Sequence, residues 1–253
     1  MGPGEALAIF AAGAGAGAIN SVVGSGSLIT FPALLAFGYP PVLANVSNNI
    51  GIVPGNVSGV YGYRAELTGQ RQRLLRLGAV SMAGALAGGL LLLKLPPHAF
   101  QAVVPVLVLI ACGLVIAQPW VNRWLAARRS HDRKRHPHGG PALLAGVFGI
   151  GVYGGYFGGA QGVLLIGLLG TFLEERLQRI NGVKNVLAGV ANITAAALFV
   201  LLAHVNWVLV ALIAAGSAIG GLIGARIGRR LPPVALRTLV VVVGVAAALR
   251  LLL

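Results

Sequence analysis

The sequence predicts an all-α protein that crosses a membrane several times and consists of two inverted copies of one helical unit. Three observations lead to this prediction: a strongly apolar composition, a self-similarity at a fixed spacing, and basic residues gathered between apolar segments. Of the 253 residues, 57% are hydrophobic and 9% are charged, and the mean hydropathy is +0.87. About a quarter of the residues of a water-soluble domain are charged. This chain has too few charged residues to cover a surface in water.

Apolar segments of membrane-spanning length recur along the chain, since about 20 residues cross the hydrocarbon core. We expect them at residues 5–36, 42–61, 77–93, 98–118, 142–170, 183–203, 207–225 and 234–253. The first and fifth are longer than one crossing requires and are rich in glycine. They predict a glycine-broken hairpin, because irregular backbone occurs inside a membrane only against protein or a watery cavity. Close helix packing through small residues explains the glycines equally well. Two paths are compatible with these segments: a full crossing of the membrane, or re-entry on the same side.

The second half of the chain resembles the first at one constant offset, the difference between positions 45 and 181, which we call the repeat offset. This offset aligns Asn45, Asn49 and Asn56 with Asn181, Asn185 and Asn192, and 95–97 (LPP) with 231–233 (LPP). Chance would give about 0.2 Asn–Asn matches at one offset, against the three observed, so we infer a duplication. We expect a first membrane repeat at 1–118, a basic cytoplasmic linker at 119–140 and a second membrane repeat at 141–253. Each repeat would hold a hairpin and three transmembrane helices.

The positions of the basic residues predict how the two copies are oriented. They lie in loops rather than on one basic face, which argues against nucleic-acid binding despite the net charge of +14. If segment 142–170 enters and leaves on one side, all 19 Lys and Arg except Lys94 and Arg250 can be cytoplasmic. If segment 142–170 crosses the membrane once, the basic residues divide more evenly between the two sides. The positive-inside rule favours the first arrangement, which inverts the copies and places both termini outside.

Asparagines inside the apolar segments form the main part of the candidate substrate site. Their spacing of four and then seven residues puts them on one stripe of a helix in each unit. The stripe residues are Asn45, Asn49 and Asn56 in the first unit and Asn181, Asn185 and Asn192 in the second. Carboxamide N–H groups can replace the hydration shell of an anion without placing a full charge in lipid. Hydrogen bonding between helices is the structural alternative.

The breaks in the two long segments supply further donors. The candidate residues are Ser25, Gly26 and Ser27 in the first break and Gln161 and Gly162 in the second. N–H groups at the N-terminus of a broken helix lie at the positive end of its dipole and suit an oxyanion. Lys184 stands beside the second Asn stripe, near a predicted helix end. It could draw anions inward, but the favoured interpretation is an interface lysine that extends its ammonium group to water.

Several other chemistries lack the residues that they require. All five Asp and Glu lie in or next to loops, so no carboxylate in the middle of an apolar segment can relay protons. The sequence has no nucleotide-binding P-loop, paired-acid site or HExxH pattern. Cys112 is the single cysteine, so neither a disulfide nor a cysteine metal site can form. We expect no enzyme activity, no catalytic residue, no metal and no cofactor.

Taken together, these motifs resemble the TauE/SafE sulfite exporter family, also called the toluene sulfonate uptake permeases. The resemblance rests on 13–17 (GAGAG), 20–32 (NSVVGSGSLITFP), the Asn helix at 45–56, their counterparts at 149–162 and 181–192, and the two LPP motifs. It covers nearly the whole chain. Family members often carry a glycine triplet before the proline, where this chain has 24–27 (GSGS). The resemblance implies a secondary carrier of sulfite, sulfonates or related anions in the bacterial inner membrane.

The favoured function is therefore multi-pass secondary transport of a small sulfur oxyanion, held where the two repeats meet. An anion channel is one alternative, and a membrane scaffold subunit without transport activity is another. The expected partners are the anionic substrate and membrane lipids, with no nucleic acid. A homo-oligomer is also compatible with the sequence.

Overall fold

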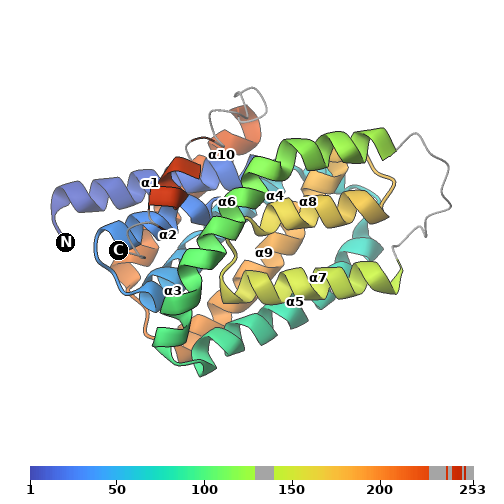
Figure 1. The fold of residues 1–253 in the computed structure, drawn as a ribbon. Helices are drawn as coiled ribbons and strands as arrows, with labels where there is room; N and C mark the ends of the chain where they lie inside the picture. Colours follow the sequence, from blue (N-terminus) through green and yellow to red (C-terminus); the bar gives the residue numbers. More distant parts are fainter. Residues whose placement is uncertain (129–139, 228–237, 239–240, 247, 249–253) are drawn as a thin grey trace.

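A computed structural model of the protein describes residues 1–128, 140–227, 238, 241–246 and 248 (Figure 1). The helices are α1 (Pro3–Val22), α2 (Ser27–Ala36), α3 (Pro41–Gly51), α4 (Val53–Gly62), α5 (Arg71–Lys94), α6 (Pro97–Arg128), α7 (Pro141–Tyr156), α8 (Gln161–Phe172), α9 (Leu177–Leu202) and α10 (Trp207–Ile227), with a short 3-10 helix η1 at Arg64–Leu67. Every element assigned in this part of the chain is helical, which confirms the all-α prediction.

Five of the described helices are long and apolar enough to cross a membrane: α1, α5, α6, α9 and α10. The helices α2, α7 and α8 are apolar but shorter. With a rise of about 1.5 Å per residue, the 10 residues of α2 extend about 15 Å and the 12 residues of α8 about 18 Å, near half of the hydrocarbon thickness. The chain is thus a multi-pass membrane protein in which α1–α2 and α7–α8 form two broken helix pairs.

The breaks within these helix pairs lie at matching positions of the chain. Gly24 between α1 and α2 has a φ of +82°, and Ala160 between α7 and α8 has a φ of +56°. These two residues are separated by the repeat offset. A left-handed conformation costs a residue with a Cβ about 1–2 kcal/mol, so the fold maintains this turn at Ala160 against a local penalty.

Glycines of the two helix pairs also allow backbones to touch, as the packing explanation expected. A Cβ added to Gly17 of α1 would overlap the carbonyl oxygen of Ser217 in α10. A Cβ added to Gly155 of α7 would overlap the carbonyl oxygen of Ala85 in α5. Small residues permit this approach between membrane helices. The first helix of each helix pair therefore packs against a long helix of the other half of the chain.

The segment predicted as one helix at 42–61 is divided in the structure. Helices α3 and α4 are separated by Ile52, whereas the matching segment forms the uninterrupted α9. Pro54 lies at the start of α4 and cannot donate a backbone hydrogen bond to the preceding turn. Val190 occupies the matching position of the second half and has no such restriction. The prediction of a single Asn helix in the first half was wrong for this reason.

Two other boundaries differ from the sequence prediction. Helix α6 continues through Pro119 to Arg128, so the described beginning of the expected linker is helical. The remainder of that linker, 129–139, lies outside the described residues. Most of the last expected segment, 234–253, lies outside them too, although 241–246 is helical. There Gly244 packs against Cys112 of α6, whose Sγ would be 2.5 Å from an added Cβ.

The directions of the helices follow from their colours in Figure 1. Helix α1 runs from the end of the molecule that holds the N-terminus toward the end at which α6 stops. Helix α7 begins at the latter end and runs in the opposite direction (Figure 1). The two helix pairs therefore enter the molecule from opposite ends, and their breaks lie in its interior.

Candidate functional site

The breaks of the two helix pairs touch each other in the interior. The backbone N–H of Gly162 donates to the carbonyl oxygen of Gly24 at 3.0 Å. A Cβ on Gly162 would lie 2.5 Å from the Cα of Gly24, so the backbones are in direct contact. The rings of Phe31 and Phe157, one from each pair, meet edge to face at 5.4 Å. Because the N–H of Gly162 is bonded within the protein, it is not available to an oxyanion in this conformation, contrary to the sequence prediction.

All the other residues expected at the site are buried as well. They are Ser25, Gly26, Ser27, Asn45, Asn49, Asn56, Gln161, Asn181, Asn185 and Asn192. Buried asparagine and serine side chains are uncommon in an apolar interior, where polar atoms need partners. Their burial places the polar stripes toward the protein interior rather than toward lipid.

Asparagine side chains connect the helices that surround the breaks. Asn49 Nδ2 of α3 donates to Asn192 Oδ1 of α9 at 3.3 Å. Asn20 Nδ2 near the end of α1 donates to Asn56 Oδ1 of α4. The N–H of Gly26 points to Asn20 Oδ1 at 3.5 Å, which brings the first break to the same group. These four residues, Asn20, Asn49, Asn56 and Asn192, form an Asn cluster that joins both halves of the chain.

Two other asparagines bond to the ends of the broken helices. Asn45 Nδ2 donates to the carbonyl oxygen of Tyr156, the last residue of α7, at 2.9 Å. Asn185 Nδ2 donates to the carbonyl oxygen of Ser21, in the last turn of α1, at 3.4 Å. Carbonyls in the last turn of a helix have no partner within the helix. These two amides provide that partner at the centre of the molecule.

Lys184 has an environment that differs from the sequence prediction. Its side chain is 1% exposed, and its Nζ lies 3.3 Å from the carbonyl oxygen of Asn20 and 3.5 Å from that of Ser21. The expectation of an interface lysine was wrong because α9 begins at Leu177, two turns before Lys184, rather than at 183. The ammonium group therefore lies against the end of α1, inside the protein.

Asn20 and Asn48 also belong to this region, although the sequence did not predict them as site residues. Asn20 bonds to Asn56, and Asn48 Oδ1 accepts a hydrogen bond from Thr30 Oγ1 of α2. One signal was present in the sequence: Asn48 and Lys184 occupy matching positions of the two halves and stand beside the two predicted stripes. A search restricted to identical residues in the two halves could not find this pair.

Several buried polar atoms of this region have no hydrogen-bond partner among the described residues. They are Ser25 Oγ, Ser47 Oγ, Asn45 Oδ1, Asn49 Oδ1, Asn56 Nδ2 and Asn181 Oδ1. Buried polar atoms are nearly always paired, so each exception indicates a position where a polar ligand or water completes the bonding. Gln161 differs, because its Nε2 points to the carbonyl oxygen of Ile150 at 3.5 Å within its own helix pair.

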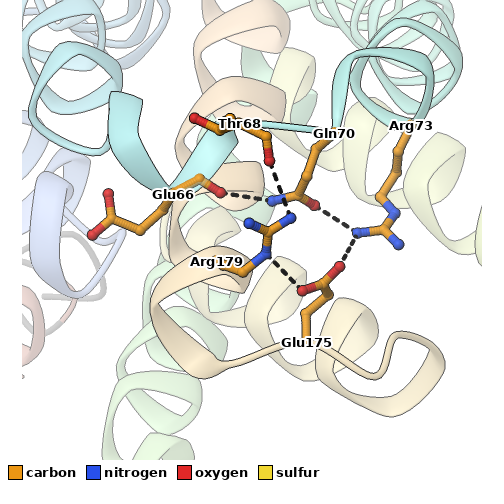
Figure 2. A network of polar contacts seen from close by, with 6 residues as sticks. All are labelled: Glu66, Thr68, Gln70, Arg73, Glu175 and Arg179. Atoms are coloured by element: carbon orange, nitrogen blue, oxygen red, sulfur yellow. Dashed lines mark hydrogen bonds and ion pairs between the residues drawn. The ribbon is translucent and has the colours of Figure 1, made fainter.

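A second polar cluster lies near the starts of α5 and α9, and Figure 2 shows its six residues. Glu175 pairs with Arg73 at 2.8 Å and with Arg179 at 2.7 Å. Gln70 donates to the carbonyl oxygen of Glu66 at 2.9 Å and accepts from Arg73 at 2.6 Å. Partial burial favours the neutral form of Glu175, but the two arginines outweigh it and hold the pKa of this carboxyl below its ordinary value of 4.5. The cluster ties the two halves of the chain together.

Comparison with known proteins gives matches over most of the chain. Residues 9–251 match the model of the family described as sulfite exporter TauE/SafE. The chain is 27% identical to the probable membrane transporter protein YfcA of Escherichia coli strain K12 over 94% of its own length and 86% of that protein. It is 28% identical to the probable membrane transporter protein ORF9 of Sinorhizobium sp, and the match covers 96% of this chain and 91% of that protein. It is 30% identical to a probable membrane transporter protein of Haemophilus influenzae, and the match covers 86% of this chain and 83% of that protein. No solved structure gives a significant match.

Proposed function

The chain belongs to the sulfite exporter TauE/SafE family of membrane transporters, and we propose that it carries a small sulfur oxyanion, such as sulfite or a sulfonate, across the bacterial inner membrane. The observation that carries this proposal is the set of buried amide and hydroxyl groups near the two breaks and on the Asn helices, in which the donors Ser25 Oγ, Ser47 Oγ and Asn56 Nδ2 have no partner among the described residues. Amide and hydroxyl donors suit an oxyanion, which has several acceptor oxygens and leaves its water behind on entry.

The substrate would be held between two inverted repeats. Three features support this arrangement: α1 and α7 run in opposite directions, each packs on a long helix of the other half, and the Asn cluster joins both halves (Figure 1). Secondary transporters with inverted repeats bind substrate near the midplane, beside discontinuous helices. The proposed site occupies the corresponding place, beside the ends of α1 and α7 and the starts of α2 and α8.

Transport would then proceed by opening first one end of the molecule and then the other. The contact between Gly24 and Gly162 closes the centre, and separation of the two breaks would free the N–H of Gly162 for substrate. The Glu175 cluster would close the cytoplasmic end, because the positive-inside rule assigns the basic loops around Arg73 and Arg179 to that side. Breaking this cluster would open a path to the cytoplasm.

The scaffold alternative makes a different use of the same asparagines. It expects them to be bonded to backbone, as Asn45 and Asn185 are. The backbone carbonyls in question, however, are the ends of helices that are broken inside the protein, and a scaffold has no need to break them. The geometry therefore favours a substrate site.

Ligand binding to the purified protein in detergent tests the proposal. The panel contains sulfite, sulfate, thiosulfate, taurine and sulfoacetate, and the readout is the midpoint of thermal unfolding. A ligand at a hundred times its Kd stabilises the folded state by about 2.7 kcal/mol, which such a measurement resolves. We expect at least one sulfur oxyanion to raise the midpoint, while chloride at the same ionic strength does not. A midpoint that no member of the panel raises would contradict the proposed substrate class.

Exchange kinetics in proteoliposomes separate a carrier from a channel. Unlabelled substrate inside the vesicles should accelerate entry of labelled substrate through a carrier, because the loaded protein returns faster than the empty one. A channel shows no such acceleration. Acceleration is the expected result, and its absence at a measurable rate of entry would favour the channel.

A further inference from the structure

Lys184 places a buried side-chain amine at the centre of the molecule, where a bound anion would favour its charged form. Its side chain is buried, and its Nζ contacts the backbone carbonyl oxygens of Asn20 and Ser21, the second of which also accepts from Asn185. No acidic side chain pairs with it in the part of the chain that the structure describes; the ion pairs found there both involve Glu175. A charge inside a membrane protein is costly and is retained where it serves an ion or a substrate pathway.

Capping the end of α1 does not by itself require a lysine. The corresponding end of α7 is capped by Asn45, a neutral amide, at 2.9 Å. Asn185, next to Lys184, already donates to Ser21 of α1. The position that matches Lys184 in the first half is held by Asn48, which is also buried but neutral. Neutral amides are therefore sufficient to cap these helix ends, and a charged side chain at Lys184 is not needed for that purpose.

The helix ends around the site leave this charge without a counterpart. Each helix C-terminus carries about half a negative charge and each N-terminus about half a positive charge. The ends of α1 and α7 and the starts of α2 and α8 all lie at the breaks, so their partial charges cancel in pairs. The ammonium form of Lys184 therefore has no counter-charge among the described residues.

We infer that Lys184 supplies the counter-charge of the substrate and restricts it to singly charged oxyanions. This inference rests on the proposed function and adds the charge of the transported species. A monoanion beside Lys184 makes the buried site neutral. A dianion would leave one negative charge uncompensated at low dielectric, where such a charge is strongly unfavourable. The sulfonate group, with one charge and three acceptor oxygens, fits the ammonium and the amide donors together.

Uptake of two labelled anions into proteoliposomes tests the inference: methanesulfonate with one charge and sulfate with two. The variant is Lys184→Gln, whose amide can still donate to the two carbonyls but carries no charge. Lys94→Gln is the matched control, because Lys94 is exposed at the end of α5. Removing one partner of a buried charge pair costs enough to lower affinity by roughly thirtyfold or more. We expect that loss for methanesulfonate in Lys184→Gln, no loss in Lys94→Gln, and a preference for methanesulfonate over sulfate in the wild type.

A second variant, Asn48→Lys, adds a cation at the matching position of the first half. It should move the preference from methanesulfonate toward sulfate, and this comparison remains informative if Lys184→Gln does not fold. Equal uptake of both anions by the wild type, or unchanged methanesulfonate affinity in Lys184→Gln, would overturn the role of Lys184 but leave anion transport intact. Unchanged charge preference in a folded Asn48→Lys would overturn it likewise. A wild type that takes up neither of these anions nor sulfite would instead refute the proposed function.

Discussion

Contact between the two breaks makes Gly162→Ala a sharp test of the fold. The added Cβ would lie 2.5 Å from the Cα of Gly24 and 2.9 Å from its carbonyl oxygen, so the backbones must separate. Overpacking of this kind costs about 1–3 kcal/mol, and loss of the hydrogen bond between the two glycines costs about 1 kcal/mol. Alanine in a helix recovers about 0.5–1 kcal/mol relative to glycine. The net loss in the free energy of unfolding should be about 1–3 kcal/mol.

Gly149→Ala is the matched control for this substitution. Gly149 lies on the exposed face of α7, and an added Cβ meets nothing within 4 Å. It should stabilise the protein by about 0.5–1 kcal/mol through helix propensity alone. The free energy of unfolding in mixed detergent micelles, measured by titration with dodecyl sulfate, compares the two variants. If Gly162→Ala proves as stable as Gly149→Ala, the two breaks do not touch and the central geometry is wrong.

Three further predictions address the site, the ion-pair cluster and the topology. Asn49→Ala should weaken substrate affinity about ten- to a hundredfold through loss of a donor, while folding stability falls by only about 0.6 kcal/mol; equal damage to both would make the asparagine purely structural. Glu175→Gln should lower stability by about 1–2 kcal/mol at pH 7, with Glu174→Gln neutral and transport retained in both. The folded-state pKa of Glu175 is lowered, so its ion pairs stabilise the folded protein above the ordinary pKa of 4.5, and this stabilisation is lost as pH falls through the lower folded value. The denaturation curves of Glu175→Gln and the wild type should therefore converge at that lower pH. A constant difference in stability down to that pH would argue against the ion pairs. Single cysteines at Gly4 and Glu174, in a Cys112→Ala background, should react with impermeant reagents from the periplasmic and the cytoplasmic side respectively, and labelling from one side would end the assigned orientation.

Local features of the sequence predicted much of the helical arrangement. The length and glycine content of 5–36 and 142–170 predicted the two broken pairs, since an apolar segment of that length exceeds what one crossing needs and glycine weakens a helix. The recurrence of Asn at the repeat offset predicted which faces are buried. Pro54 was a sequence signal for the division between α3 and α4, because proline cannot donate the backbone hydrogen bond that would continue the helix. The regular spacing of the Asn stripe indicated an unbroken helix instead, and that prediction was wrong.

Features that depend on packing between distant segments could not be predicted in this way. The contact of Gly24 with Gly162 joins residues on different helix pairs, and neither neighbourhood identifies the partner. The burial of Lys184 depends on where α9 begins and on the position of the end of α1 beside it. A lysine next to a helix end ordinarily reaches water, so local reasoning gives the common outcome and misses this exception.

Uptake of radiolabelled sulfite into proteoliposomes tests the central claim most directly, in the wild type, in Asn49→Ala/Asn192→Ala and in Asn206→Ala. Asn49 and Asn192 bond to each other in the proposed site, whereas Asn206 lies beyond the end of α9 and caps the start of α10. Loss of that cap costs about 1 kcal/mol of stability, so Asn206→Ala controls for destabilisation alone. The account predicts saturable uptake by the wild type and Asn206→Ala, with affinity at least about tenfold weaker in the double variant. No uptake by the folded wild type, or equal affinity in all three proteins, would contradict it.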